Sequence, residues 1–170
     1  GKFTDKKLVL TFDDGPHAIY TPQILDILQQ YDVKATFFVL GSNAGRYPDI
    51  IRRMILEGHE VGSHTFRHKN VGYMSSLERQ IDMNATQRLI QSLTGHSSVL
   101  FRPPYTTDFQ IPRREAAALY ELQKQGYRLI GTYVDSMDWT GDTAAEIVEN
   151  VFYHLDFGNI ILMHDAGGNR

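Results

Sequence analysis

Short apolar segments alternate with helical segments along this chain, and this alternation limits the possible folds more than any other feature. The apolar segments are rich in β-branched or aromatic residues, as buried strands are, and cover 8–12, 35–40, 60–63, 99–102, 128–134 and 159–163. An alternation of strands and helices predicts parallel strands joined by right-handed crossovers, with helices covering the sheet.

The expected helices carry recognisable start and stop signals. Thr21-Pro22 opens the first helix, and capping boxes at 75–78 and 143–146 open two others. Glycines suited to a left-handed cap follow three expected helices, which cover 50–57, 77–93 and 114–125.

Composition excludes several classes of protein. A chain of 170 residues with 42% hydrophobic content is expected to form one domain, residues 1–170, with a sizeable core. The net charge of -3 and the scattered basic residues argue against a nucleic-acid partner. No apolar run reaches the ~18 residues of a membrane span, and no targeting segment is recognisable. Because cysteine is absent, any transition metal must be held by histidine and carboxylate.

The last expected strand is followed only by a short glycine-containing segment, 165–170. A parallel strand is normally covered on both faces, and no helix remains to cover the outer face of this one. We therefore expect a domain whose C-terminal helix lies beyond Arg170.

Polar side chains gather where the expected strands end. Five different strands contribute them: Asp13, Asp14, His64, His68, Arg102, Asp135, Asp138, His164 and Asp165. Parallel α/β proteins build their sites at this edge of the sheet. Because the first and last strands must share one small site, we expect a barrel, which need not be regular, in preference to a doubly wound open sheet.

The histidines and the aspartate pair predict a metal site. His64 and His68, with one carboxylate from Asp13 or Asp14, supply three ligands and leave one position open for water. A divalent cation lowers the pKa of such a water toward ~7 and polarises a carbonyl group, which predicts hydrolysis of an ester or amide. The other carboxylate is then available as a general base. The spacing does not decide which aspartate binds the metal.

Three further residues complete the predicted chemistry. His164 is a candidate general acid that protonates the leaving group, and Asp135 is expected to orient it. Arg102 would neutralise and direct the free carboxylate. We expect Asp138 to be a weaker candidate than Asp135, and Asp165 to be a structural support whose side chain points away from His164.

Each of these candidate site residues also has a simpler explanation. An isolated Asp-Asp-Gly-Pro sequence is usually a solvated turn. His64 and His68 would often be a surface pair, and His164 follows a wholly apolar strand where a hydrogen-bonded core histidine is the rival interpretation. The presence of all these residues at strand ends favours the site.

Five motifs, in order along the chain, resemble those of the polysaccharide deacetylases of carbohydrate esterase family 4. They are Thr-Phe-Asp-Asp-Gly-Pro at 11–16, His-Thr-Phe-Arg-His at 64–68, Arg-Pro-Pro-Tyr at 102–105, Asp-Ser-Met-Asp-Trp at 135–139 and Leu-Met-His-Asp at 162–165. The resemblance implies a distorted (β/α) barrel, a general base at Asp13, and a metal, commonly zinc, bound by Asp14, His64 and His68.

The resemblance also implies roles for the residues around the metal. Arg102 would pair with Asp13, Asp135 would tune His164, and the Tyr105 backbone N–H would stabilise the oxyanion. Trp139 and Leu162 would line the pocket for the acetyl methyl group. The segment 106–112 is longer than expected after this motif, and substrate preference could reside in it.

The resemblance implies an acetylated polysaccharide as substrate. Peptidoglycan and chitin-like N-acetylglucosamine polymers come first, acetylxylan comes second, and the implied location is the cell envelope or the extracellular space. Two rival functions stay open: a glycoside hydrolase that uses paired carboxylates without metal, and a sugar-binding module without turnover. A serine hydrolase is disfavoured because no Gly-x-Ser-x-Gly sequence occurs.

Overall fold

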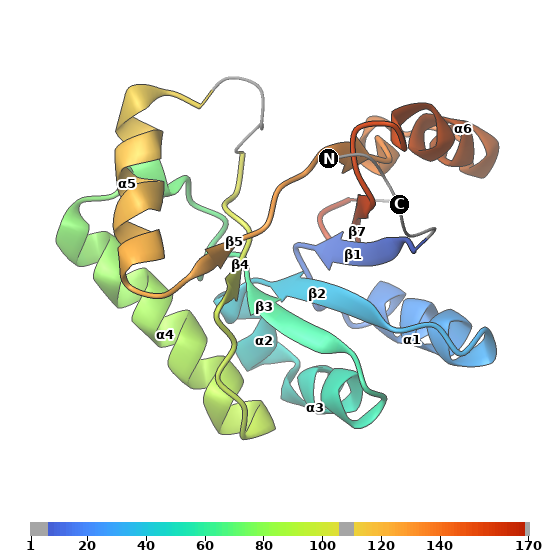
Figure 1. Cartoon of the computed structure of the whole chain (residues 1–170). Coiled ribbons are helices and arrows are strands. Elements are labelled where there is room, and N and C mark those ends of the chain that lie inside the picture. Colours follow the sequence, from blue (N-terminus) through green and yellow to red (C-terminus); the bar gives the residue numbers. More distant parts are fainter. Residues whose placement is uncertain (1–6, 106–110, 169–170) are drawn as a thin grey trace.

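The computed structural model describes residues 7–105 and 111–168, which form one curled sheet with helices on its outer side (Figure 1). The sheet contains seven parallel strands in the order β5-β4-β3-β2-β1-β7-β6. Their bounds are β1 Val9–Asp13, β2 Ala35–Val39, β3 Glu60–Ser63, β4 Leu100–Phe101, β5 Arg128–Leu129, β6 Val134–Asp135 and β7 Ile160–His164. The predicted parallel, barrel-like α/β fold is confirmed.

The helices connect these strands and agree in most places with the sequence signals. Their bounds are α1 Tyr20–Gln30, α2 Gly41–Arg46, α3 Pro48–Leu56, α4 Ser76–Thr94, α5 Arg113–Lys124 and α6 Ala144–His154, with 3-10 turns η1 Val71–Tyr73 and η2 Asp138–Thr140. Both predicted capping boxes are present, at the starts of α4 and α6. Gly95 adopts φ 74° directly after α4, as the left-handed cap requires. The short helix α2 was not predicted.

The prediction of one strand over 128–134 is wrong. This run forms two short strands at opposite edges of the sheet: β5 pairs with β4, and β6 pairs with β7. The residues between them cross from one edge to the other (Figure 1), and the Gly131 carbonyl accepts a hydrogen bond from Arg102 at 3.1 Å. An apolar pattern reports burial but not the neighbouring strand, so the sequence could not reveal this crossing.

The first and last strands are neighbours in the middle of the sheet. In the β1–β7 pairing, Asp13 lies opposite His164 and Thr11 lies opposite Leu162. Side chains of paired residues point to the same face, so these four side chains share the inner face of the curled sheet. The proximity of the two chain ends therefore comes from direct pairing of β1 and β7.

The hydrophobic core lies between the sheet and the helices. Phe12 alternates with Asp13 and packs on the outer side, where its ring lies 5.2 Å from that of Phe37. A second cluster, which includes Phe101 and Leu122, lies beneath α4 and α5. Tight packing on this side holds the strand ends in place for the polar groups that follow them.

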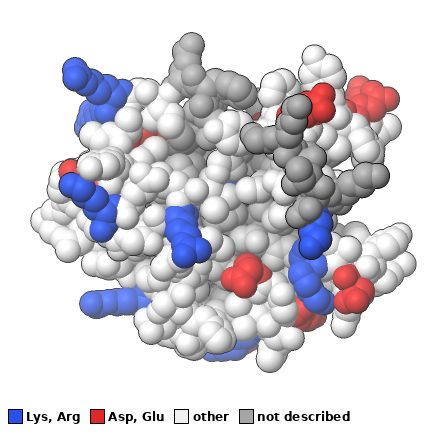
Figure 2. Space-filling view, in the orientation of Figure 1, with Lys and Arg blue, Asp and Glu red and all other residues white. Residues whose placement is uncertain are grey.

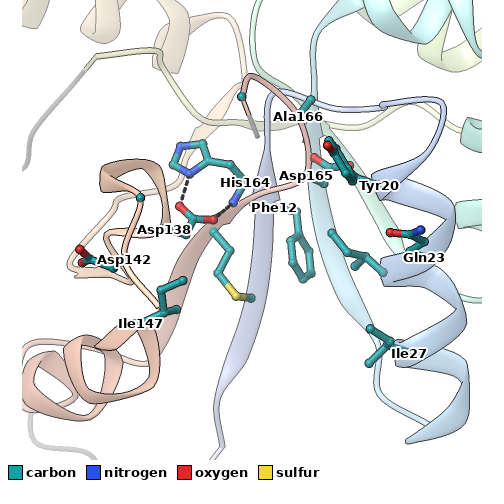
Figure 3. A pocket seen from close by; sticks show the side chains of 14 residues that line it. Phe12, Tyr20, Gln23, Ile27, Asp138, Asp142, Ile147, His164, Asp165 and Ala166 are labelled. Atoms are coloured by element: carbon teal, nitrogen blue, oxygen red, sulfur yellow. Dashed lines mark hydrogen bonds and ion pairs between the residues drawn. The ribbon is translucent and has the colours of Figure 1, made fainter. Parts of the chain in front are cut away.

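An apolar pocket remains on the outer side of β1 and β7, between α1 and α6 (Figure 3). Phe12, Ile24, Ile27, Ile147 and Met163 supply most of its apolar lining. Asp138, His164 and Asp165 also line this pocket, so it borders the polar residues that follow the strands.

The surface gives two further observations. On the face shown in Figure 2, the described Lys and Arg side chains lie in separate small groups, with acidic and uncharged residues between them. Across residues 7–105 and 111–168, no helix combines the length and the apolar character that a membrane crossing requires.

Candidate metal and catalytic site

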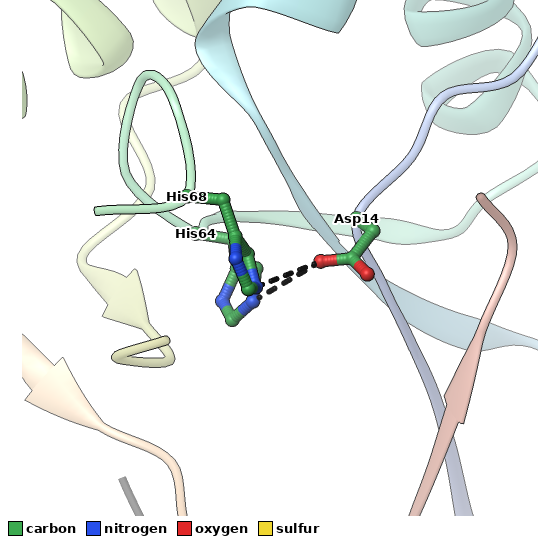
Figure 4. Close-up of side chains that lie close together, drawn as sticks. All are labelled: Asp14, His64 and His68. Atoms are coloured by element: carbon green, nitrogen blue, oxygen red, sulfur yellow. Dashed lines mark ion pairs between the residues drawn. The ribbon is translucent and has the colours of Figure 1, made fainter. Parts of the chain in front are cut away.

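Asp14, His64 and His68 converge just beyond the carboxyl ends of β1 and β3 (Figure 4). Their ligand atoms all lie within 4.8 Å of one another. The Asp14 Oδ1 atom is 3.2 Å from Nε2 of His68 and 3.5 Å from Nε2 of His64. The three predicted metal ligands are therefore brought together from the ends of β1 and β3.

The His64 ring is held in the tautomer that a metal ligand needs. Its Nδ1 lies 2.7 Å from the backbone carbonyl of Arg102, which can only accept a hydrogen bond, so Nδ1 carries the proton. The lone pair of Nε2 then faces Asp14 and His68. A backbone carbonyl behind a ligating imidazole is a common support of metal sites because it fixes the ring orientation.

The side chains present fit a divalent cation. Asp14 Oδ1 is buried and has no hydrogen-bond partner among the described residues, although two imidazole nitrogens face it. Burial raises the pKa of Asp14, but interactions with His64 and His68 lower it more, so the pKa is held well below its usual range. An ionised carboxylate with two imidazoles is a donor set typical of catalytic zinc sites.

Asp13 and Arg102 form a buried ion pair beside this cluster. The Arg102 Nη1 group donates to Asp13 Oδ1 at 2.7 Å, and both side chains are almost fully buried. Arg102 is itself fixed by a hydrogen bond to Thr11 and by the Phe38 ring, whose centroid lies 4.4 Å from its guanidinium carbon. The pairing of Arg102 with Asp13 that the resemblance implies is therefore present.

The two neighbouring aspartates thus have different partners. Asp14 faces both histidines, whereas Asp13 is paired with Arg102 and its Oδ2 atom lies 3.8 Å from Nε2 of His64. This separation leaves Asp13 next to the cluster with its own counter-charge. The geometry favours Asp14 as the metal ligand and Asp13 as the base.

The predicted contact between Asp135 and His164 is wrong, because Asp138 occupies that place (Figure 3). Asp138 Oδ1 lies 2.7 Å from Nδ1 of His164, and Asp138 Oδ2 accepts the His164 backbone N–H at 2.7 Å. The Asp135 carboxylate instead accepts the backbone N–H of Met137 and the indole N–H of Trp139.

The local backbone conformation explains why Asp138, and not Asp135, contacts His164. Asp135 ends β6 opposite Leu162, two residues short of His164. Met137 then adopts a left-handed conformation with φ 60°, which turns the chain and brings Asp138 to the histidine. The sequence showed two aspartates three residues apart but did not show this turn.

His164 has the electrostatic environment of an acid. Burial lowers its pKa, but the hydrogen bond and charge of Asp138, together with the charges of Asp13 and Asp14, raise the pKa above its ordinary value. The Asp138 contact also assigns the Nδ1 proton, so Nε2 of the protonated ring is free to donate.

The three predicted substrate-pocket residues lie in different environments. Leu162 is buried on the same face as His164, whereas Trp139 is 51% exposed and Tyr105 is 68% exposed. The Tyr105 ring packs against His68, with 4.5 Å between ring centroids. Their roles toward an acetyl group stay predictions, and most of the long segment 106–112 lies outside the described residues.

Asp165 points away from His164, as predicted for a supporting residue. Its Oδ2 accepts a hydrogen bond from Thr21 at 2.6 Å, and its backbone N–H donates to the Asp13 carbonyl at 3.1 Å. Complete burial raises the pKa of Asp165 to about 7. Asp165 therefore braces the loop that carries Asp13 and Asp14.

A curled parallel sheet that gathers two histidines and a carboxylate beside two further charged pairs defines an α/β protein with a candidate metal centre. Comparison with protein families identifies it further. The polysaccharide deacetylase family matches residues 1–130, so this chain belongs to that family.

Individual relatives agree with this assignment. The chain is 36% identical to a peptidoglycan-N-acetylglucosamine deacetylase of Bacillus cereus, over 100% of this chain and 60% of the relative. It is 37% identical to the peptidoglycan-N-acetylmuramic acid deacetylase PdaC of Bacillus subtilis, over 94% of this chain and 32% of the relative. The chain thus spans less than two thirds of either protein.

A solved structure shows the same fold. The crystal structure of the Bc1960 peptidoglycan N-acetylglucosamine deacetylase, in complex with 4-naphthalen-1-yl-N-oxidanyl-benzamide, superimposes with a TM-score of 0.88 at 36% identity. The match covers 99% of this chain and 76% of that chain.

Proposed function

We propose that this chain is the catalytic domain of a metal-dependent hydrolase that removes acetyl groups from N-acetylated amino sugars of a polysaccharide. The convergence of Asp14, His64 and His68 beside the Asp13–Arg102 and His164–Asp138 pairs carries this proposal. In this proposal the residues provide a cation site, a base and an acid, which hydrolysis of an unactivated amide requires.

The proposed cation is Zn²⁺. Asp14, His64 and His68 would hold it, and it would polarise the acetamide carbonyl and activate the water. Asp13 accepts the proton of the attacking water. Arg102 holds the Asp13 carboxylate in place and balances its charge, so that the carboxylate stays available as a base. The Tyr105 backbone N–H is proposed to stabilise the developing oxyanion.

His164 completes the reaction. The bond between the acetyl carbon and the sugar nitrogen breaks, and protonated His164 donates its Nε2 proton to the departing nitrogen. Asp138 stabilises the imidazolium through the contact with Nδ1. The products are acetate and a free amino sugar, and no covalent intermediate with the protein is needed.

The relatives support peptidoglycan as the polymer. Deacetylases that act on its N-acetylglucosamine and on its N-acetylmuramic acid both resemble this chain. We therefore propose N-acetylglucosamine residues of peptidoglycan as the first substrate and chitin-like polymers as the second. Peptidoglycan is a polymer of the cell envelope, so we propose that the activity is located at the cell envelope or outside the cell. Trp139 and Leu162 are proposed to contact the acetyl methyl group.

Free acetate released from a panel of acetylated glycans tests this function. The protein is first stripped with a chelator, then assayed alone and after addition of Zn²⁺, with Asp13→Asn as the inactive control. We expect acetate only from the zinc-loaded wild type, and most from N-acetylated polymers.

Two outcomes would replace the proposal. New reducing ends without acetate, unaffected by chelation, would identify a glycoside hydrolase. Saccharide binding by zinc-loaded protein without acetate release would identify a binding module.

A further inference from the structure

The junction between β2 and α2, residues 40–43, contacts the loop that carries Asp14. The Asn43 side-chain amide donates a hydrogen bond to the Asp14 backbone carbonyl at 2.8 Å. In the same region, the Leu40 backbone N–H donates to the Gly15 carbonyl at 3.0 Å. Residues that follow β2 therefore donate hydrogen bonds to two successive backbone carbonyls of this loop.

The same junction also holds the loop that carries the two histidines. The Gly41 N–H donates to the Thr65 carbonyl at 3.0 Å, and the Ser42 N–H donates to the Phe66 carbonyl at 2.9 Å. The junction thus connects the Asp14 loop and the 64–68 loop, which come from different parts of the sequence. Its geometry fixes the relative position of the three candidate ligands.

Both loops contain residues whose backbone conformation is unfavourable for side chains of L-residues. Asp14 has φ 75°, Thr65 has φ 70° and His68 has φ 58°. Such conformations are costly and persist only where the surroundings enforce them. For β-branched Thr65 the conformation is especially unusual. Hydrogen bonds from residues 40–43 supply that enforcement at Asp14 and Thr65.

The junction itself is firmly packed. Val39 before it and Ala44 within α2 are completely buried. A Cβ atom on Gly41 would lie 2.3 Å from the Phe66 ring, so only glycine allows these two segments to approach each other so closely. Asn43 therefore projects from a rigid base, and its amide can fix the Asp14 backbone without moving itself.

We infer that Asn43 is a positioning residue of the metal site. Its amide holds the Asp14 peptide in the left-handed conformation, and this directs the Asp14 carboxylate toward His64 and His68. Asn43 contacts the backbone of a ligand through its amide and is not itself part of the ligand cluster. The inference rests on the proposed metal site and adds a residue to it that the five sequence motifs do not contain.

Zinc affinity of purified, metal-free protein tests this role. Asn43→Ala removes the amide, and Asn43→Leu removes it while keeping a similar side-chain volume and adding no charge. Supporting residues around metal ligands typically contribute 10- to 100-fold in affinity, so we expect both variants to bind Zn²⁺ about 10- to 100-fold more weakly. At saturating Zn²⁺, kcat should return close to the wild-type value, because the bound cation then orders Asp14.

Asn159→Ala is the matched control. The Asn159 amide also donates to a backbone carbonyl, that of Lys7 at 3.2 Å, but this bond lies before β1 at the opposite end of the strand. We expect its zinc affinity to equal that of the wild type. Competition with a chelating dye gives the affinities, and circular dichroism reports folding of each variant.

The outcomes separate this inference from the proposed function. If the wild type binds no Zn²⁺, the metal site itself is refuted. If the wild type binds Zn²⁺ and a folded Asn43 variant binds it equally tightly, the role of Asn43 is refuted while the function stands. Should Asn43→Ala fail to fold, the result with Asn43→Leu decides.

Discussion

Asp138 and His164 are joined twice: the Asp138 carboxylate lies 2.7 Å from Nδ1 of the His164 ring and accepts the His164 backbone N–H at 2.7 Å. The second contact ties the position of the carboxylate to the end of β7. The ring therefore meets a negative charge whose place is set by the backbone, and the pKa of His164 is raised above its ordinary value in spite of burial, which acts in the opposite direction.

Asp138→Asn should shift the basic limb of the pH profile of kcat/KM to lower pH. The amide keeps the shape but removes the charge that favours the imidazolium, so the pKa of His164 falls and the acid is lost at lower pH. At neutral pH we expect a rate loss within the ~10²- to 10⁴-fold that general acid catalysis contributes. Asp135→Asn is the control and should leave the limb in place. If only Asp135→Asn shifts the basic limb, Asp135 and not Asp138 is the residue that tunes His164.

His68→Ala should lose the metal as well as the activity. The Nε2 atom of His68 is the closer of the two imidazole nitrogens to Asp14 Oδ1, at 3.2 Å, and its removal leaves only two ligands. We expect a loss of zinc affinity of at least ~100-fold, measured by metal analysis after dialysis. His96→Ala, which changes an exposed histidine, should keep full occupancy. One zinc ion per chain in His68→Ala would remove His68 from the ligand set.

Asp13→Asn and Asp14→Asn should differ in their effect on metal binding. Asp13→Asn is expected to keep Zn²⁺ and lose about 10²- to 10⁴-fold in kcat, because it removes the base. Asp14→Asn is expected to lose Zn²⁺. Since Asp13→Asn leaves buried Arg102 without its counter-charge, at a cost of about 3–5 kcal/mol, the assays belong well below its unfolding temperature. The reverse pattern would exchange the two roles.

Asp165 should make the metal-free protein less stable as pH rises from about 4 to 7. Burial raises its pKa from 3.8 to about 7, so the folded state binds the proton more tightly than the unfolded chain. Its contribution to the free energy of unfolding is therefore greatest at low pH and falls by on the order of a few kcal/mol across this window.

Asp165→Asn should remove this trend. Urea unfolding at several pH values, in the presence of a chelator, should show the variant gaining stability relative to wild type as pH rises. Asp32→Asn, which changes a side chain that is 95% exposed, controls for the loss of one carboxylate. If the free energies of unfolding of Asp165→Asn and wild type differ by the same amount at every pH, the raised pKa of Asp165 is contradicted.

Much of the fold and site followed from local sequence patterns. Strand segments, capping boxes and the glycine after α4 depend on neighbouring residues only, so the sequence predicts them well. The ligand cluster was also predictable, because side chains after parallel strands meet at one edge of the sheet and the motifs of the resembled family named the same residues.

Features that depend on backbone turns or distant contacts were not predictable. The splitting of 128–134 depends on which edge each half pairs with, and an apolar pattern is the same for both. The choice between Asp135 and Asp138 depends on the left-handed conformation of Met137, a non-glycine residue that gives no signal for it. The contact of Asn43 with Asp14 joins residues 29 positions apart through a helix that the sequence did not predict.

Diffraction at the zinc absorption edge from crystals grown with Zn²⁺ tests the account most directly. We predict one strong anomalous peak, within about 2.0–2.2 Å of the Nε2 atoms of His64 and His68 and of an Asp14 carboxylate oxygen, with Asp13 still paired to Arg102. A peak at another position, or these three side chains ordered without a peak between them, would contradict it.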